Sequence, residues 1–553
     1  MSKKESFIKG TLILAGAALL VRLLGLFQRV PLEHVFGDTG NASYGLANNV
    51  YLMLLTIASA GIPSTLSKMV SEKYALNKPE EAKRIYQAAL MFGAVSGLLI
   101  TVFLYLVAPY YATNIAKVPE ASVAIRAIAP ALLLFPTIAM MRGYFQGRGN
   151  MSASGISQIM EQILRVITAI GLAFVMYGMG YSDKWLAAGA SFGSVFGSIG
   201  AFGVMLYYAM KMRKSDEGKL TLEPGITTGT GTGTGGANLP FKRIYLDIFK
   251  LSIPIVLTSL TVSAVNFIDG SIVKTLLIDH IGEGPAEQAL AFLTSRAQMV
   301  AGIPPILAIA LSTSLIPVIS AAFVKKDEVH LKNQVTLAMR ISILSGLPLV
   351  IVLGTAAYSV NGLLFKSLDG YGIVGFLTLM TIFQITMMTS NSILLGVGKP
   401  YLSMVNVMVG IVVKLAASFA LAPVWGIYGI IAATGLCFLV ITLLNLWTMK
   451  KIVPFSLMGN RWVGFLLTVI VLMGAGYGLN QAGIQMVSIM PARIAFFLTC
   501  CIVGVAVVAL YPVMLVLLRV VRKDELSGYP APLRKLLSPL MRLQRSGQSG
   551  VAK

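Results

Sequence analysis

The sequence predicts an all-α, polytopic membrane protein with about fourteen transmembrane helices. Three observations support this fold class. Hydrophobic residues make up 56% of the 553 residues and charged residues only 12%, whereas a soluble domain carries roughly 25% charged residues. The apolar residues gather in runs close to the roughly 20 residues that cross about 30 Å of hydrocarbon. The basic residues fall in short loops between these runs, as the positive-inside rule describes.

Each predicted span is bounded by polar or turn residues. The first one is expected to be a retained helix, not a signal peptide, because Arg22 interrupts its apolar run and no clean small-residue cleavage site follows. The connections at Gly398-Lys399-Pro400 and Ala422-Pro423 are only a few residues long. The predicted spans are residues 6–30, 43–68, 85–108, 121–145, 154–178, 185–211, 246–276, 287–322, 331–358, 372–396, 401–422, 426–449, 461–480 and 491–520.

The distribution of lysine and arginine predicts the orientation in the cytoplasmic membrane. Inner loops are basic and outer loops hold little beyond Lys117, Lys184 and Lys366, so the N-terminus is expected inside. An even number of crossings returns the basic C-terminal tail to the cytoplasm, where it is loose or lies on anionic lipid. The formal net charge of +22 does not indicate nucleic-acid binding, because the bases do not form one folded basic face.

The domain organisation is predicted from a linker and an internal repeat. An N-terminal lobe of six helices (1–215) precedes a Gly/Thr-rich cytoplasmic linker (216–240), and a C-terminal lobe of six helices follows (241–452). Two further helices (453–522) and a basic cytoplasmic tail (523–553) complete the chain. The Gly/Thr run of the linker fits GxGxxG, but no strand precedes it, so it is interpreted as flexible chain and not as a phosphate-binding loop.

The two lobes share short motifs in the same order. Ala60-Gly-Ile-Pro63 recurs as Ala301-Gly-Ile-Pro304, Gly147-Arg-Gly-Asn150 aligns with Gly396-Val-Gly-Lys399, and Met210-Lys211 aligns with Met449-Lys450. A six-helix duplication gives both halves the same orientation, so a pseudo-twofold axis should run along the membrane normal. Halves of this kind enclose a site at their interface and expose it alternately.

Arginines inside the predicted helices are the candidate site residues. Arg22 and Arg29 are nearly two turns apart and share one helix face. By helical rise, Arg22 lies roughly 22 Å and Arg296 roughly 17 Å above the inner boundary, so both could face one cavity from opposite lobes. Arg29 either joins that cavity or extends to the outer headgroups with Glu33 and His34. A cation buried in the bilayer is energetically costly unless it pairs with another group or faces a polar cavity. Arginine can bind phosphate oxygens bidentately, so these positions are candidates for binding a phosphate-bearing anion.

Four further charged positions are candidates: Arg165 and Lys414 for the cavity, and Asp269 and Glu161 for an ion-coupling or structural role. Arg165 aligns with Lys414 in the repeat, and both lie near mid-membrane. Glu161 precedes Arg165 by four residues, a spacing that favours an ion pair, and no such acid accompanies Lys414. Asp269 either binds a coupling cation or pairs with Lys274.

No covalent chemistry is predicted. Cys437, Cys500 and Cys501 lie in apolar runs, the histidines are scattered in or near loops, and no metal-ligand spacing or Ser/His/Asp set is present. The chain is therefore expected not to be an enzyme and to need no metal or cofactor.

Several stretches resemble a known family. They are Arg22-Leu-Leu-Gly-Leu-Phe-Gln-Arg29-Val-Pro, Gly61-Ile-Pro-Ser-Thr-Leu-Ser-Lys68, Arg142-Gly-Tyr-Phe-Gln-Gly147, Ser157-Gln-Ile-Met-Glu-Gln-Ile-Leu-Arg165 and the region from Ser295-Arg296 to Pro317. Over nearly the whole chain the sequence is similar to the polysaccharide-biosynthesis flippases of the MOP superfamily, in the SpoVB/YtgP-like branch related to the lipid II flippase MurJ. The resemblance implies a MATE/MOP-like fold of two six-helix lobes and a final helix pair.

The resemblance also implies a function. A flippase of this family exports an undecaprenyl-pyrophosphate-linked cell-wall precursor, lipid II, by alternating access, and arginines equivalent to Arg22, Arg29 and Arg296 contact the pyrophosphate. The implied partners are this lipid-linked anion, membrane lipids and cell-wall synthesis proteins; a coupling ion, Na⁺ or H⁺, is left open.

Three alternatives stay open. The substrate could be another lipid-linked oligosaccharide, as for capsule, teichoic acid or spore cortex. The chain could be a cation-coupled exporter of the MATE type, whose cavity should favour acids. It could also be a non-transporting membrane scaffold, which would not need deep charges at matched depth.

Overall fold

Helices are the only regular secondary structure in the part of the chain that the structure, a computed structural model, describes. That part comprises residues 7–59, 61–76, 78–222, 241–306, 319–320, 322–323, 327–453, 455, 457, 459–522, 534 and 538–543. The Gly/Thr run of the predicted linker and most of the predicted tail lie outside it. Two compact units are formed, Met1–Ser295 and Arg296–Lys553.

Twelve helical stretches are long and apolar enough to cross a membrane. Together with the all-helical architecture, they confirm the predicted polytopic membrane protein. Of the fourteen predicted spans, residues 6–30 fall in the 29-residue helix α1 (Phe7–Val35), which is not among the twelve. The span 287–322 is only partly described, so the total of fourteen crossings stays a prediction.

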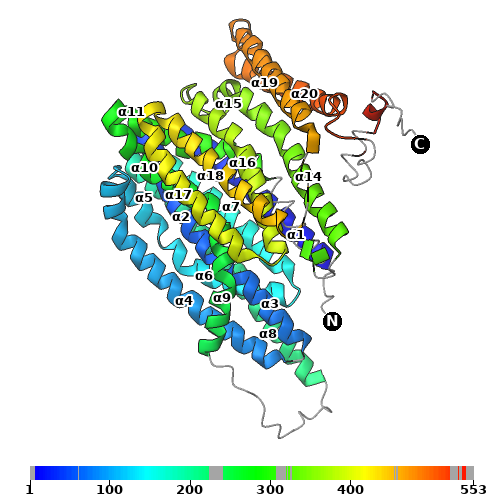
Figure 1. The fold of residues 1–553 in the computed structure, drawn as a ribbon. Coiled ribbons are helices and arrows are strands. Elements are labelled where there is room, and N and C mark those ends of the chain that lie inside the picture. Colours follow the sequence, from blue (N-terminus) through cyan, green and yellow to red (C-terminus); the bar gives the residue numbers. More distant parts are fainter. Residues whose placement is uncertain are drawn as a thin grey trace, which may run out of the picture. The chain divides into compact units, whose positions relative to one another are not determined.

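In the first unit α7 packs against both α1 and α8, α6 packs on α3 and α4, and α2 packs on α5, α10 and α11. These helices run from blue to green in Figure 1. The elements after α1 are α2 (Asp38–Ser59), α3 (Ile62–Ala75), α4 (Pro79–Tyr110), the π-helix η1 (Tyr111–Ile115), α5 (Ala121–Ile128), α6 (Ala131–Gly147), α7 (Met151–Gly178), α8 (Asp183–Leu222), α9 (Phe241–Ser259), α10 (Thr261–Ile281) and α11 (Glu283–Ala291).

Three predicted spans of this unit consist of two helices each. The span 43–68 divides at Gly61 into α2 and α3, with Pro63 in the first turn of α3, where a missing N–H costs nothing. The span 121–145 divides into α5 and α6 at Pro130, because the residue before a proline disfavours helix. The span 246–276 divides at Leu260, although hydrogen bonding continues there from the Ala264 N–H to the Leu260 carbonyl at 2.7 Å.

In the second unit α16 packs against both α14 and α18, α17 packs on α18, and α19 packs on α20, the orange pair in Figure 1. The predicted span 331–358 ends earlier, at Thr355, and a separate short helix follows. The elements are α12 (Gln298–Ala301), α14 (Glu328–Thr355), α15 (Ala357–Leu364), α16 (Tyr371–Gly396), α17 (Pro400–Trp425), α18 (Ile427–Lys450), η3 (Gly459–Arg461), α19 (Trp462–Ile484), η4 (Gln485–Ser488), α20 (Ala492–Leu517) and η6 (Leu540–Leu543). The π-helix η2 (Phe292–Ala297) includes the boundary between the units.

One pair of repeat motifs forms the same turn in both units. Gly149, after α6, has φ +79°, and Gly398, after α16, has φ +73°. The Asn150 N–H donates to the Phe145 carbonyl at 2.9 Å, and the Lys399 N–H donates to the Leu394 carbonyl at 2.9 Å. A left-handed glycine with this long backward bond is a common way to end a helix. The two turns therefore share one geometry, and the six-helix duplication stays a prediction.

A line of glycines lets α8 approach α7 closely. A Cβ atom at Gly193 would lie 2.7 Å from the Ala169 nitrogen, and one at Gly197 would lie 2.8 Å from the Glu161 carbonyl oxygen. A Cβ atom at Gly189, one turn earlier, would meet the side-chain sulfur of Met176. Small residues at every fourth position are how membrane helices bring their backbones together. α8 therefore braces the part of α7 that carries the candidate site residues.

Candidate functional site

The two arginines of α1 have no carboxylate partner in the described part of the chain. The Arg22 side chain is exposed, and Arg29 is half-buried. The Nη1 atom of Arg29 is buried and has no hydrogen-bond partner among the described residues. Glu33 and His34, the alternative partners considered for Arg29, lie 3.8 Å from each other. A buried guanidinium N–H without an acceptor is costly, so this position is suited to an incoming anion.

Tyr44 of α2 joins Arg29 to the rest of the unit. The guanidinium carbon of Arg29 lies 4.9 Å from the centre of the Tyr44 ring, a cation–π distance. Gln28 Nε2 donates to the Tyr44 hydroxyl at 2.9 Å. Tyr44 and Tyr51 lie nearly two turns apart on α2, hence on one face, and Tyr51 accepts a hydrogen bond from Arg165 Nη2 at 2.5 Å.

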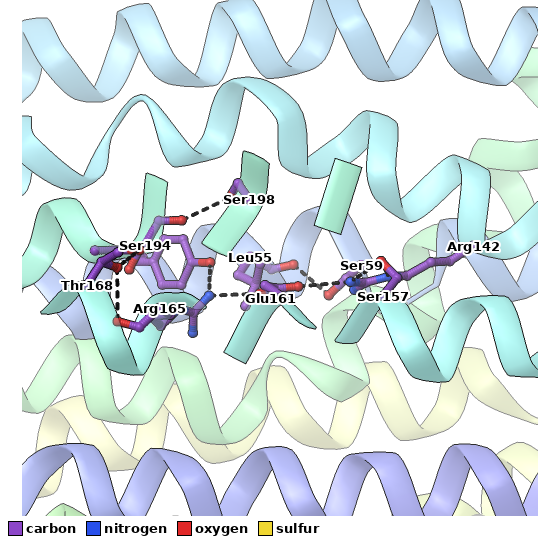
Figure 2. A network of polar contacts seen from close by, with 11 residues as sticks. Leu55, Ser59, Arg142, Ser157, Glu161, Arg165, Thr168, Ser194 and Ser198 are labelled. Carbon is purple, nitrogen blue, oxygen red and sulfur yellow. Dashed lines mark hydrogen bonds and ion pairs between the residues drawn. The ribbon is translucent and has the colours of Figure 1, made fainter. Parts of the chain in front are cut away.

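Glu161 of α7 lies between two arginines, as Figure 2 shows. Its Oε1 atom accepts from Arg165 Nη2 at 2.8 Å, which confirms the predicted pair four residues apart. Its Oε2 atom accepts from Arg142 Nη2 of α6 at 2.9 Å. Arg142 also donates to the Ser157 hydroxyl, at 2.9 Å from Nη2. We call Arg142, Glu161 and Arg165 the Glu161 cluster.

The Glu161 cluster is almost fully enclosed. The exposed fractions of its side chains are 9% for Arg142, 10% for Glu161 and 13% for Arg165. Two guanidinium groups and one carboxylate leave a net charge of +1 in this enclosed position. The Nε atom of Arg165 is buried and has no hydrogen-bond partner among the described residues. The first unit therefore holds buried, incompletely satisfied cations on α1 and α7.

Arg296 lies at the start of the second unit, in the π-helix η2. Short π-helical turns are frequent at functional sites. Its Nη1 donates to the carbonyl of Ser367 at 3.1 Å and to that of Asp369 at 2.8 Å, and its guanidinium lies 5.3 Å from the centre of the Phe365 ring. Arg296 is 5% exposed. In this structure it therefore holds the loop between α15 and α16. A role in binding substrate stays a prediction.

Lys414 and Asp269 are both buried. Lys414 of α17 has no exposed surface, and its Nζ donates to the Ser418 hydroxyl at 2.9 Å. Asp269 of α10 is 3% exposed. Lys274, the partner considered for Asp269, pairs across the turn with Glu283 at 3.2 Å and with Glu287 at 2.7 Å. The predicted cavity role of Lys414 and the ion-coupling role of Asp269 are not tested by these contacts.

Sequence reasoning did not include Arg142, Tyr44 or Tyr51 in the site. Arg142 stands 19 residues before its partner, across the α6–α7 turn, and no local spacing indicates that pair. The sequence holds one indication of its importance: Arg142 lies in an apolar run that contains no acidic residue to pair with it. Among the described residues, no three His, Cys, Asp or Glu side chains are grouped as metal ligands. The site is thus made of arginine, tyrosine and a single glutamate, which suits reversible binding of an anion.

The sequence was compared with protein families and with known proteins. The model of a family described as "Polysaccharide biosynthesis protein" matches residues 7–323, more than half of the chain. The chain is 26% identical to "Stage V sporulation protein B" of Bacillus subtilis (strain 168) over 535 residues, 95% of this chain and 98% of that protein. It is also 26% identical to "Lipid II flippase MurJ" of the same organism over 470 residues, 82% of this chain and 84% of that protein.

A solved structure shares the fold. It is titled "Lipid II flippase MurJ, inward closed conformation", and it superposes with a TM-score of 0.65 at 14% identity, covering 90% of this chain and 98% of that one. At this identity the likeness concerns the fold alone. Because the family model covers most of the helices described here, the chain belongs to the polysaccharide biosynthesis protein family.

Proposed function

We propose that the protein is a flippase that exports an undecaprenyl-pyrophosphate-linked cell-wall precursor, lipid II, across the cytoplasmic membrane by alternating access. The observation that carries the proposal is the half-buried guanidinium of Arg29, which lies over the Tyr44 ring and has an Nη1 atom without a hydrogen-bond partner among the described residues. A diphosphate supplies the acceptors that these arginines need, and arginine stays charged at any relevant pH.

The relatives favour a lipid-linked substrate. One relative is named a lipid II flippase and matches over 82% of this chain. An anion attached to a polyprenyl chain would place its charged head among the arginines while its tail remains in the lipid. The alternating movement would involve the two predicted six-helix lobes, with both termini in the cytoplasm.

Genetic rescue tests the proposal most directly. Cells depleted of their own lipid II exporter should grow when they express this chain, and Arg22→Ala or Arg296→Ala should abolish the rescue. Arg126→Ala is the matched control, because Arg126 donates to the Tyr105 carbonyl and this contact is solvent-exposed. Membrane levels of each variant are measured by immunoblot. Normal rescue by both Arg22→Ala and Arg296→Ala at normal levels would contradict the proposal.

A second substrate is favoured by one observation. The relative with the broader coverage, 95% of this chain and 98% of its own length, is named a stage V sporulation protein. The second candidate is therefore a flippase for a lipid-linked saccharide that is used in sporulation. Rescue of a strain lacking that protein, without rescue of the lipid II exporter depletion, would favour this candidate.

A further inference from the structure

The charge balance of the Glu161 cluster has no counterpart in the second unit. The repeat offset that relates the Gly149 and Gly398 turns places Asn391 at the position of Arg142, Gly410 at that of Glu161 and Lys414 at that of Arg165. One cation thus stands where the first unit has two, and the carboxylate is absent.

Uncharged side chains connect the equivalent helices of the second unit. Asn445 of α18 donates through Nδ2 to the Asn391 side-chain oxygen at 2.7 Å, and Asn406 of α17 donates to the Asn445 side-chain oxygen at 2.8 Å. Amides therefore suffice to join three helices at this level of the fold. Of these three amides, Asn391 is the one whose counterpart in the first unit, Arg142, is charged.

The geometry of Glu161 suggests a competition. Both carboxylate oxygens are occupied, one by each arginine, at 2.8 and 2.9 Å. Among the described residues, Arg165, which donates to Tyr51, retains a buried Nε–H without a partner, and Arg29, which contacts Tyr44, retains a buried Nη1. An anion that reaches Arg165 would find it already attracted to an internal carboxylate. In an enclosed site of low dielectric this competition strongly lowers the affinity for the anion.

We propose that Glu161 sets the affinity of the site: its carboxylate competes with the transported diphosphate for Arg165, so that the anion binds weakly enough to be released. This inference depends on the proposed function. A carrier needs binding that is favourable enough for uptake and weak enough for exit. Without Glu161 the cluster would carry +2 instead of +1, and the substrate would be held too tightly. Glu161 is a positioning residue here, since it acts through Arg165.

Four versions of the protein test this by changing the cluster charge in steps. Arg142→Gln gives a net charge of 0, the native chain +1, the double variant Arg142→Gln with Glu161→Gln again +1, and Glu161→Gln alone +2. The probe is farnesyl pyrophosphate, with farnesol as its uncharged counterpart, and the protein is held in nanodiscs of zwitterionic lipid. Affinity is expected to change by about tenfold for each unit of charge, with the double variant close to the native value.

Export separates an affinity-setting role from a structural one. Glu161→Gln should bind farnesyl pyrophosphate more tightly and yet export substrate more slowly, because release becomes limiting. A merely structural glutamate predicts weaker binding and slower export together, and a double variant worse than either single one. Thermal unfolding of each variant is recorded. If Glu161→Gln does not fold, the affinities of the native chain, Arg142→Gln and the double variant for farnesyl pyrophosphate still distinguish the two roles. The affinity-setting role predicts that the double variant binds about as tightly as the native chain and that Arg142→Gln binds more weakly.

The outcomes distinguish the two proposals. If the native chain binds farnesyl pyrophosphate no better than farnesol, the diphosphate site and the proposed function both fail. If the native chain prefers the diphosphate but affinity does not follow the charge series, only the role of Glu161 is overturned.

Discussion

Arg29 of α1 lies with its guanidinium carbon 4.9 Å from the centre of the Tyr44 ring of α2. The ring provides a cation–π contact, but it supplies no acceptor to the Nη1 atom, which stays without a partner among the described residues. The contact therefore orients the guanidinium without neutralising it.

Replacement of Arg29 should separate charge from geometry. Arg29→Gln is expected to abolish export, whereas Arg29→Lys keeps the charge and loses the planar fork, so export should fall to an intermediate rate. The measurement is the initial rate of precursor export in cells with equal protein levels. Equal rates for Arg29→Gln and the native chain would remove Arg29 from the site.

Removal of the Tyr51 hydroxyl should loosen Arg165. Tyr51 is fully buried, and phenylalanine fills the same space, so Tyr51→Phe mainly deletes the acceptor of the 2.5 Å hydrogen bond. The expected loss of stability is about 1 kcal/mol. In a double-mutant cycle with Arg165→Gln, measured by thermal unfolding in detergent, the two losses should not add. Full additivity would show that the two side chains are not coupled.

A methyl group at Gly197 should separate α7 from α8. The new Cβ would lie 2.8 Å from the Glu161 carbonyl oxygen, so the backbones must move apart at about 1–3 kcal/mol. Gly203→Ala is the matched control on the same helix, because its new methyl group would have no atom within 4 Å and alanine favours helix. Gly197→Ala should lower both unfolding temperature and anion binding, and Gly203→Ala neither.

The paired turns should respond alike. Gly149→Ala and Gly398→Ala each place a side chain in the left-handed region, at roughly 1–2 kcal/mol, although neither new Cβ meets another atom. Gly171→Ala, at a helical glycine of α7 with open space, is the control and should not destabilise. The measurement is the thermal unfolding of each variant. Clearly unequal losses of stability in Gly149→Ala and Gly398→Ala would argue against equivalent turns in the two units.

The sequence was sufficient for features that depend on local spacing. The apolar runs predicted the helices, and the i,i+4 spacing predicted the pair of Glu161 with Arg165. The second arginine on Glu161 was not predicted, because Arg142 approaches from another helix. Lys274 likewise pairs with Glu283 and Glu287, which lie beyond a turn on the next helix, and local spacing did not predict these pairs. The interruption at Leu260 was missed since no glycine or proline marks that residue.

Insertion into the bilayer is constrained by the Arg142–Glu161 pair. α6 carries Arg142 and contains no acidic residue, whereas α7 brings Glu161 together with Arg165. A lone arginine is expensive in hydrocarbon, and only three residues, 148–150, separate the two helices. The pair should therefore leave the translocon as one hairpin, and a nascent chain truncated just after α6 should integrate poorly when an engineered glycosylation tag reports its topology.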